Sequence, residues 1–163
     1  MNILSDTQIG ALISERKTIP DGLRPIGKQI ERNQHRRRDF DVSGASGSEF
    51  MVAIRQSTLN PFDFSVILGY KVPGFNTVFR LRRYNGKSHV HTNIIEGDTV
   101  QGFHIHYATE RYQIRGGSKE DGFAQKTDRY WTLESAIDCL IGDCGFVAPI
   151  DDSPLFTGTP YAN

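Results

Sequence analysis

The sequence predicts an α+β domain in which an antiparallel sheet of about five strands is flanked by an N-terminal and a C-terminal helix. Three observations favour this class. Apolar residues recur at helical spacing near both ends of the chain, and they alternate with polar residues through its middle. Short connections between the alternating runs favour antiparallel pairing. With 163 residues, the chain is expected to fold as a single domain over 1–163.

The first 38 residues are expected to hold a short helix followed by a basic segment. Ser5 or Asp6 is suited to cap a helix whose apolar stripe consists of Ile9, Leu12 and Ile13. Prolines and glycines then break the chain. The stretch 28–38 is strongly basic, and we expect a loop or a frayed helix there.

Residues 39–108 are predicted to form an antiparallel meander. Apolar and polar residues alternate in five runs, at 40–42, 50–54, 62–68, 79–81 and 103–107. Because successive side chains on a strand point to opposite faces, each run is typical of a strand with one face on a core.

The C-terminal helix is predicted within 130–146. Thr132 is suited to cap it, and one apolar face is formed by Leu133, Ala136, Ile137, Leu140 and Ile141. Gly145 is placed to end the helix. The tail, 147–163, contains prolines and shows no apolar periodicity, so we expect an extended strap or a mobile end.

Composition favours a cytoplasmic protein that makes no membrane contact. No apolar run approaches the roughly 18 residues needed to cross a bilayer. The N-terminus lacks the basic start and apolar centre of a secretory signal. The two cysteines, Cys139 and Cys144, are too few for a disulfide framework and are expected to be inert thiols.

Charge is spread unevenly, although the formal net charge is zero. Residues 1–83 carry 13 Lys/Arg and 8 Asp/Glu, a balance of +5, whereas residues 84–163 carry 6 and 11, a balance of −5. The basic segment Arg24 to Arg38 therefore predicts a nucleic-acid or phosphate partner. The same asymmetry also fits attraction between the two halves of one fold, and a protein partner stays open.

Four of the five histidines form two His-x-His pairs, His89/His91 and His104/His106. Alternate residues share one face of a strand, so His104 and His106 are expected to project together, away from the core. This parity is the strongest pointer to a site in the sequence.

Arginines follow the same rule on a preceding strand. Arg80, Arg82 and Tyr84 are expected on the face opposite Phe79 and Leu81. If this strand pairs with the one carrying His104 and His106, arginines and histidines meet on one face. Arg55 and Asp63, from earlier strands, are expected there too.

Metal binding is one interpretation of the histidine pairs. His-x-His on a strand suits zinc, iron, manganese or copper, usually with a carboxylate. His89, His91 and Glu96 loosely resemble the first motif of cupins, but the upstream glycine spacing and a second motif are absent. Nearby arginines would also oppose a dication. The sequence therefore assigns no metal ligand and leaves the cofactor unknown.

Metal-free cleavage of RNA, or of another phosphodiester, is the second interpretation. His104 and His106 are the candidate catalytic residues, because histidine can serve as acid and base near neutral pH. The candidate ligand-binding residues supply guanidinium donors, stacking rings or further imidazoles, and they are Arg80, Arg82, Tyr84, His89, His91, Arg111 and Tyr112.

A non-catalytic module that binds another protein is the third interpretation. Histidines and arginines on sheets are often solvated or bonded to neighbouring carboxylates. The second half of the chain supplies many carboxylates, including Glu96, Asp98 and Glu110. All three interpretations remain open at this point.

Three strings in the second half of the chain stand out: RYNGKSHVHTN at 83–93, FHIH at 103–106 and ATERY at 108–112. Together they resemble an uncharacterised bacterial protein family with the signature RYNGKSHxHTN…FHIHxATERY. The resemblance continues through 124–130 and the closing helix, and it covers roughly residues 50–146. It implies a bacterial or mobile-element origin, and it brings no assigned activity and no catalytic residues.

Overall fold

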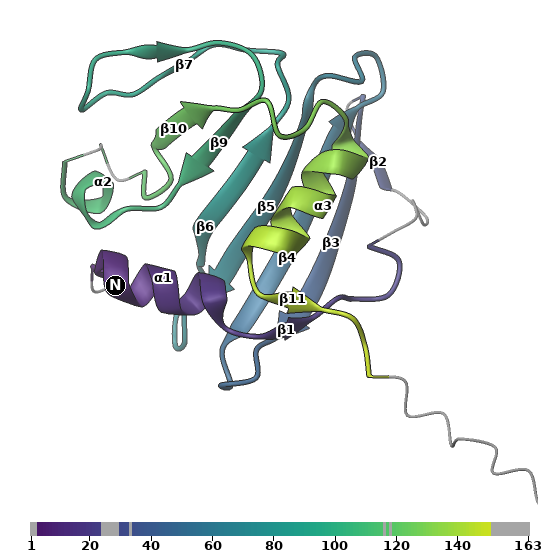
Figure 1. The fold of residues 1–163 in the computed structure, drawn as a ribbon, viewed down its shortest axis with the longest axis vertical. Coiled ribbons are helices and arrows are strands. Elements are labelled where there is room, and N and C mark those ends of the chain that lie inside the picture. The colour runs from purple at the N-terminus through teal and green to yellow at the C-terminus, as the bar shows by residue number, and fades with distance from the viewer. Residues whose placement is uncertain (1–2, 24–29, 33, 116, 118, 151–163) are drawn as a thin grey trace, which may run out of the picture.

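A computed structural model describes residues 3–23, 30–32, 34–115, 117 and 119–150, with only the backbone described for 30–32 (Figure 1). Within these ranges the helices are α1 (Asp6–Ser14), α2 (Glu110–Arg115) and α3 (Leu133–Asp143). The predicted α+β class, with a helix near each end, is confirmed. None of the described helices is both long and apolar enough to cross a membrane.

One antiparallel sheet organises the described residues. Its seven strands follow the spatial order β10 (Phe123–Lys126), β9 (His104–Tyr107), β6 (Val78–Asn85), β5 (Phe64–Lys71), β4 (Glu49–Ser57), β3 (His35–Ser43) and β2 (Ile30–Arg32). Two short two-stranded sheets are separate from it. The first pairs β1 (Lys17–Thr18) with β11 (Phe146–Val147), and the second pairs β7 (His91–Thr92) with β8 (Thr99–Val100).

Alternation predicts five of these strands, namely β3, β4, β5, β6 and β9. It does not identify β2 and β10, which have three and four residues and little apolar alternation. The loop or frayed helix expected at 28–38 is wrong where the chain is described, because β2 pairs with the start of β3 as a hairpin. Parts of two predicted segments, 24–29 and 33 of the basic segment and 151–163 of the tail, lie outside the described residues.

Both terminal helices begin at the predicted caps. The Ser5 side chain accepts from the backbone N–H of Gln8, whose side chain accepts from the Ser5 N–H in return. Thr132 and Ser135 form the same reciprocal box at α3. These boxes use N–H groups that the first helical turn leaves without partners.

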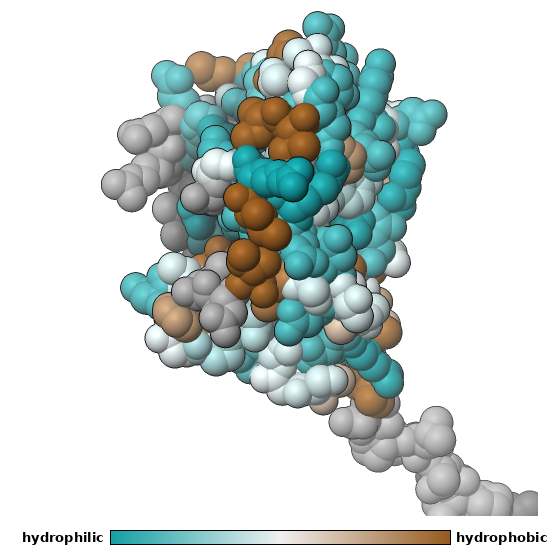
Figure 2. Space-filling view, turned by 90° about the vertical axis from the view of Figure 1, so that its left-hand side faces the viewer, coloured by the Kyte–Doolittle hydropathy of each residue, from teal (hydrophilic) through white to brown (hydrophobic). Residues whose placement is uncertain are grey.

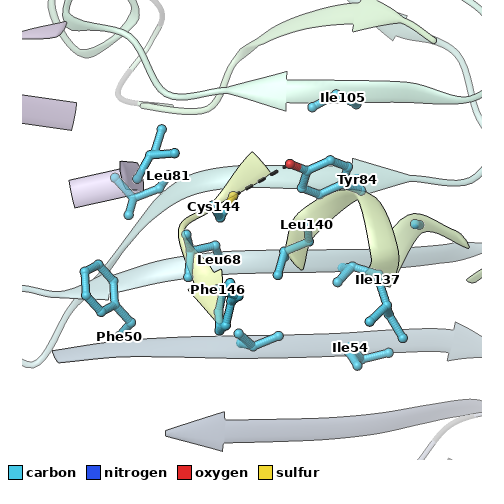
Figure 3. Close-up of a cluster of buried hydrophobic side chains, with 14 of the residues drawn as sticks. Phe50, Ile54, Leu68, Leu81, Tyr84, Ile105, Ile137, Leu140, Cys144 and Phe146 are labelled. Carbon is cyan, nitrogen blue, oxygen red and sulfur yellow. Dashed lines mark hydrogen bonds between the residues drawn. The ribbon is translucent and has the colours of Figure 1, made fainter. Parts of the chain in front are cut away.

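The hydrophobic core lies between α3 and one face of the sheet, here called the inner face (Figures 1 and 3). Ile137 and Leu140 of α3 pack with Leu68 of β5 and Ile54 of β4, as the predicted apolar face requires. The opposite face of the sheet, called the outer face, has no helix across it in Figure 1. His104 and His106 of β9, which alternate with the core residue Ile105, lie on this outer face.

Lys17 connects the C-terminal end of α1 to the C-terminal end of α3. Its side chain is buried, and its ammonium donates to four backbone carbonyls, those of Leu12 (2.8 Å), Ile13 (3.0 Å), Glu15 (2.7 Å) and Cys144 (3.1 Å). These carbonyls belong to the C-terminal ends of α1 and α3, where a positive charge is favourable. The Lys17 N–H also donates to Gly145 O at 2.9 Å.

A register shift in β6 decides which of its side chains reach the outer face. Leu68 of β5 pairs with Arg82, but the next residue, Gly69, pairs with Arg80, so Leu81 is an extra residue in β6. Such a bulge reverses the alternation after it. Leu81 and Arg82 consequently both lie on the inner-face side, and Arg83 lies on the outer face.

The side of the molecule that carries α2 and the β7–β8 hairpin is shown in Figure 2. Hydrophobic patches there alternate with hydrophilic side chains. Ile94, between β7 and β8, and Ile114, in α2, are exposed.

Asn93 pairs with the outer edge of β10. Its side-chain amide exchanges two hydrogen bonds with the backbone of Ala124 (2.9 and 2.8 Å).

Candidate functional site

Four histidines form one cluster on the outer face, called here the histidine cluster. β9 supplies His104 and His106, and the segment that leads from β6 through β7 supplies His89 and His91. The His104 and His106 ring centroids are 5.0 Å apart. His91 lies 4.5 Å from His106 and His89 lies 5.2 Å from His104, again between centroids. The structure therefore joins both predicted His-x-His pairs.

The predicted pairing between the arginine strand and the histidine strand is confirmed, as is the shared face of His104 and His106. Across the β6–β9 pair, Arg83 lies opposite His106 and Asn85 lies opposite His104. Neither Arg83 nor Asn85 was among the predicted site residues.

The predicted positions of Arg82 and Tyr84 on this face are wrong, because the bulge at Leu81 reverses the alternation. Tyr84 is buried in the core and donates to Asp143 at 2.9 Å. The Arg82 guanidinium lies 4.4 Å from the centroid of the Tyr107 ring. Arg80 precedes the bulge and keeps its predicted face.

His104 and His106 lie beneath the surface, with 0 % and 1 % of their area exposed. Their Nδ1 atoms lie 2.7 Å from Gly102 O and 2.9 Å from Asp121 O. A carbonyl only accepts, so the network assigns the hydrogen of each ring to Nδ1. Both Nε2 atoms then accept from the Asn85 side-chain amide, at 3.4 and 3.3 Å.

Burial keeps these two imidazoles neutral. It lowers the pKa of His104 to about 4 and the pKa of His106 to about 2, and the charge of Arg83 acts in the same direction. Arg83 Nη2 lies 3.2 Å from His106 Nδ1, so protonation of that ring would place two cations side by side. Neither ring is placed to exchange protons with a ligand near neutral pH.

Two arginines share one buried carboxylate beside the cluster. Asp121, which is 1 % exposed, lies 3.0 Å from Arg83 Nε and 3.4 Å from Arg80 Nη1. The Arg83 Nε–H is close to Asp121 Oδ2 without hydrogen-bond alignment, and both atoms are buried without another partner in the described structure. Glu120 is a second carboxylate beside these arginines, and it accepts from the Arg80 backbone N–H at 3.0 Å.

His91 and His89 form the outer part of the histidine cluster. His91 is half-buried, and its Nε2 lies 2.8 Å from Gly122 O, which leaves the hydrogen on Nε2. His89 is exposed, and burial of part of its ring, followed by the charge of Arg83, lowers its pKa. These two imidazoles are therefore the ones that a ligand can approach.

Asp63 connects the cluster to the neighbouring strands. It accepts from Ser88 Oγ at 3.2 Å, and its carboxylate lies 3.8 Å from Arg55 and 3.4 Å from His35. The predicted placement of Arg55 and Asp63 on one face is confirmed. Ser88 Oγ also lies 3.4 Å from His89 Nδ1.

Arg111 and Tyr112, two of the predicted ligand-binding residues, lie on α2 and do not join the histidine cluster. Both contact Glu96, and the Tyr112 hydroxyl donates to it at 2.6 Å. The Arg111 guanidinium lies 4.8 Å from the Phe123 ring centroid. Glu96 is thus bound to α2, which removes the carboxylate of the cupin-like interpretation.

Two arginines in the described part of the basic segment have partners within the protein. Arg37 contacts Asp39 at 3.0 Å, and Arg38 is buried and donates to Gly22 O at 2.8 Å.

Across the described ranges, no three His, Cys, Asp or Glu side chains are arranged to hold a metal ion. At the centre of the histidine cluster, the two Nε2 lone pairs meet an amide N–H₂ group.

Comparison with family models, curated proteins and solved structures gave no match to this chain. The resemblance to an uncharacterised bacterial family therefore stays a prediction.

Proposed function

We propose that the histidine cluster and the cations beside it bind a phosphate-bearing ligand, and that RNA is the first ligand to test. The observation that carries this proposal is the sharing of the buried Asp121 carboxylate by Arg80 and Arg83. Asp121 contacts Arg80 through Nη1 at 3.4 Å, and the half-exposed Arg80 guanidinium has further N–H groups that can donate to an incoming anion.

The cations are within reach of a ligand. The side chains of Arg80 and Arg55 are 48 % and 46 % exposed, and that of Arg83 is 26 % exposed. A planar guanidinium donates two parallel hydrogen bonds to a phosphate, which suits it to such recognition. Arg55 and Arg83 lie on β4 and β6, on the two sides of β5.

Within this proposal the four histidines have two roles. His89 and His91 contact the ligand, because they are the accessible members of the cluster. His104 and His106 are positioning residues, since every ring nitrogen of theirs already has a partner within the protein. This replaces the catalytic roles predicted for them. If the ligand is cleaved, His89 is the residue to act as base, because its lowered pKa keeps it neutral at pH 7.

The proposal includes a cytoplasmic location, which is supported by two free cysteines, Cys139 and Cys144. It keeps the predicted bacterial or mobile-element origin as an expectation.

Binding is tested by fluorescence anisotropy with a labelled single-stranded RNA and with inorganic polyphosphate as competitor, over a series of salt concentrations. Phosphate contacts predict affinity that falls as salt rises. Arg55→Gln should weaken binding and reduce the salt slope by about one unit. Lys71→Gln is the matched control, because Lys71 is a cation at the opposite end of the sheet, paired with Asp41 at 2.6 Å.

Equal loss in Arg55→Gln and Lys71→Gln would contradict a site at the histidine cluster. Absence of binding to RNA and to polyphosphate would overturn the proposal and favour a module that binds another protein.

A further inference from the structure

An exposed aromatic group lies at the end of the sheet next to the histidine cluster. Phe62 is 41 % exposed, and its ring centroid lies 6.2 Å from that of Phe103 in an edge-to-face arrangement. Phe103 in turn packs on Phe64 (6.2 Å) and on the buried Tyr130 (5.8 Å). An exposed ring is thus supported from below by rings that belong to the core.

A lysine lies over this pair of rings. Lys87 Nζ is 4.3 Å from the centroid of Phe62 and 5.7 Å from that of Phe103. An ammonium at this distance is attracted to the face of an aromatic ring. We call Phe62, Phe103 and Lys87 the aromatic ledge.

The aromatic ledge and the histidine cluster are joined at two points. Lys87 is followed by Ser88 and His89, and Ser88 is bonded to Asp63, the neighbour of Phe62 in the chain. Phe103 is followed by His104, whose ring contacts His89 at 5.2 Å. A ligand held at the cluster would therefore lie against an exposed ring.

The cations beside the ledge come from separate strands of the sheet. Arg55 lies on β4 and Arg83 on β6, so β5 separates them. Neighbouring strands are about 4.8 Å apart, which places the two backbones about 10 Å from one another. Cations on separate strands can contact separate phosphates of one extended chain.

We propose that the ligand is a single-stranded nucleic acid, with an unpaired base stacked on Phe62 and its phosphates at Lys87, Arg55 and Arg83. This inference rests on the proposed function and names its ligand class. An aromatic ring stacks on any unpaired base, whereas the bases of a duplex are already stacked on each other. Single-stranded RNA and DNA share this chemistry.

The test uses the full chain and four labelled or competing probes: a single-stranded RNA, the DNA of the same sequence, the corresponding duplex and polyphosphate. Phe62→Leu removes the stacking ring but keeps an apolar side chain. Phe75→Leu is the matched control, because Phe75 is also an exposed phenylalanine in a loop, at the opposite end of β5. Thermal melts show whether both variants keep the fold.

We expect single strands to bind more tightly than the duplex, and Phe62→Leu to weaken single-strand binding by about tenfold or more. Phe75→Leu should leave it unchanged. Tighter binding of RNA than of DNA would support a contact to the 2′-hydroxyl in addition.

Two results separate this inference from the proposed function. If duplex and polyphosphate bind as tightly as the single strands and Phe62→Leu behaves like Phe75→Leu, stacking is overturned and a phosphate site remains. If no probe binds, both proposals fail.

Discussion

Arg83 lies directly opposite His106 across the β6–β9 pair, so a guanidinium stands beside a buried imidazole. The bulge at Leu81 creates this relationship, because without the extra residue Arg82 would hold that position. Burial, together with the permanent cation beside it, lowers the pKa of His106 and disfavours its protonation. His104 and His106 are therefore held neutral by their surroundings, and this determines how the stability of the fold depends on pH.

Stability should fall as the pH drops below 6.5. Burial lowers the pKa of His104 to about 4, below the ordinary 6.5, so the unfolded chain binds a proton that the folded chain does not. The contribution of His104 is complete above pH 6.5 and is lost between 6.5 and about 4, at about 1.4 kcal/mol per pH unit. Urea unfolding, followed by circular dichroism at pH 7.5, 6, 5 and 4.5, measures this loss.

His104→Gln provides the comparison, since glutamine does not titrate in this range. Its stability should depend less steeply on pH between 6.5 and 5 than that of the unsubstituted protein. Identical slopes for the two proteins would mean that His104 is protonated equally in the folded and unfolded states.

Asn85→Leu should destabilise the fold by about 2 kcal/mol or more, because it leaves two buried Nε2 acceptors without a donor. Chemical denaturation measures the loss. Asn76→Leu, at an exposed asparagine between β5 and β6, is the matched control and should change stability by less than about 0.5 kcal/mol. Comparable effects in both variants would show that the amide does not hold the histidine cluster.

Asp121→Asn should strengthen the binding of polyanions and steepen its salt dependence. The substitution removes the carboxylate that Arg80 and Arg83 share, so the local positive charge increases. A lower melting temperature is also expected, since a buried ion pair is lost. Asp41→Asn, which frees Lys71 at the far end of the sheet, is the matched control. Weaker binding by Asp121→Asn in a folded protein would contradict a phosphate site at these arginines.

Lys17→Met should lower the free energy of unfolding by about 2–4 kcal/mol, because several buried carbonyls would lose their donor. Lys71→Met removes an exposed lysine and is expected to change stability by less than about 0.5 kcal/mol. Equal midpoints of denaturation for the two variants would show that Lys17 does not stabilise the contact between the ends of α1 and α3.

The sequence is informative about this fold where a local pattern has one physical meaning. The caps at Ser5 and Thr132 are such patterns, since a hydroxyl before an apolar stripe satisfies free N–H groups. The shared face of His104 and His106 follows from the pleat of any strand. These features depend on nearest neighbours alone.

Other parts of the site depend on contacts between distant residues. The bulge at Leu81 has no glycine or proline in β6, and Gly69 lies across from it in β5. The pairing of Gly69 with β6 is not visible in the sequence, so the inward position of Arg82 and the outward position of Arg83 could not be predicted. Asp121 reaches the cluster from the segment between α2 and β10. Its role depends on the packing of that segment against β6 and β9, for which the sequence carries no periodic signal.

The hydrogen bonds by which Lys17 connects α1 to the end of α3 have a consequence for synthesis on the ribosome. Lys17 is made early, but two of its acceptors, the carbonyls of Cys144 and Gly145, are made more than 120 residues later. At Gly145, a side chain would meet the Glu15 and Ser14 carbonyls, so this late segment must close tightly on the early one. The nascent chain therefore cannot complete its fold until residue 145 has left the exit tunnel, and a chain stopped short of it would expose a buried lysine.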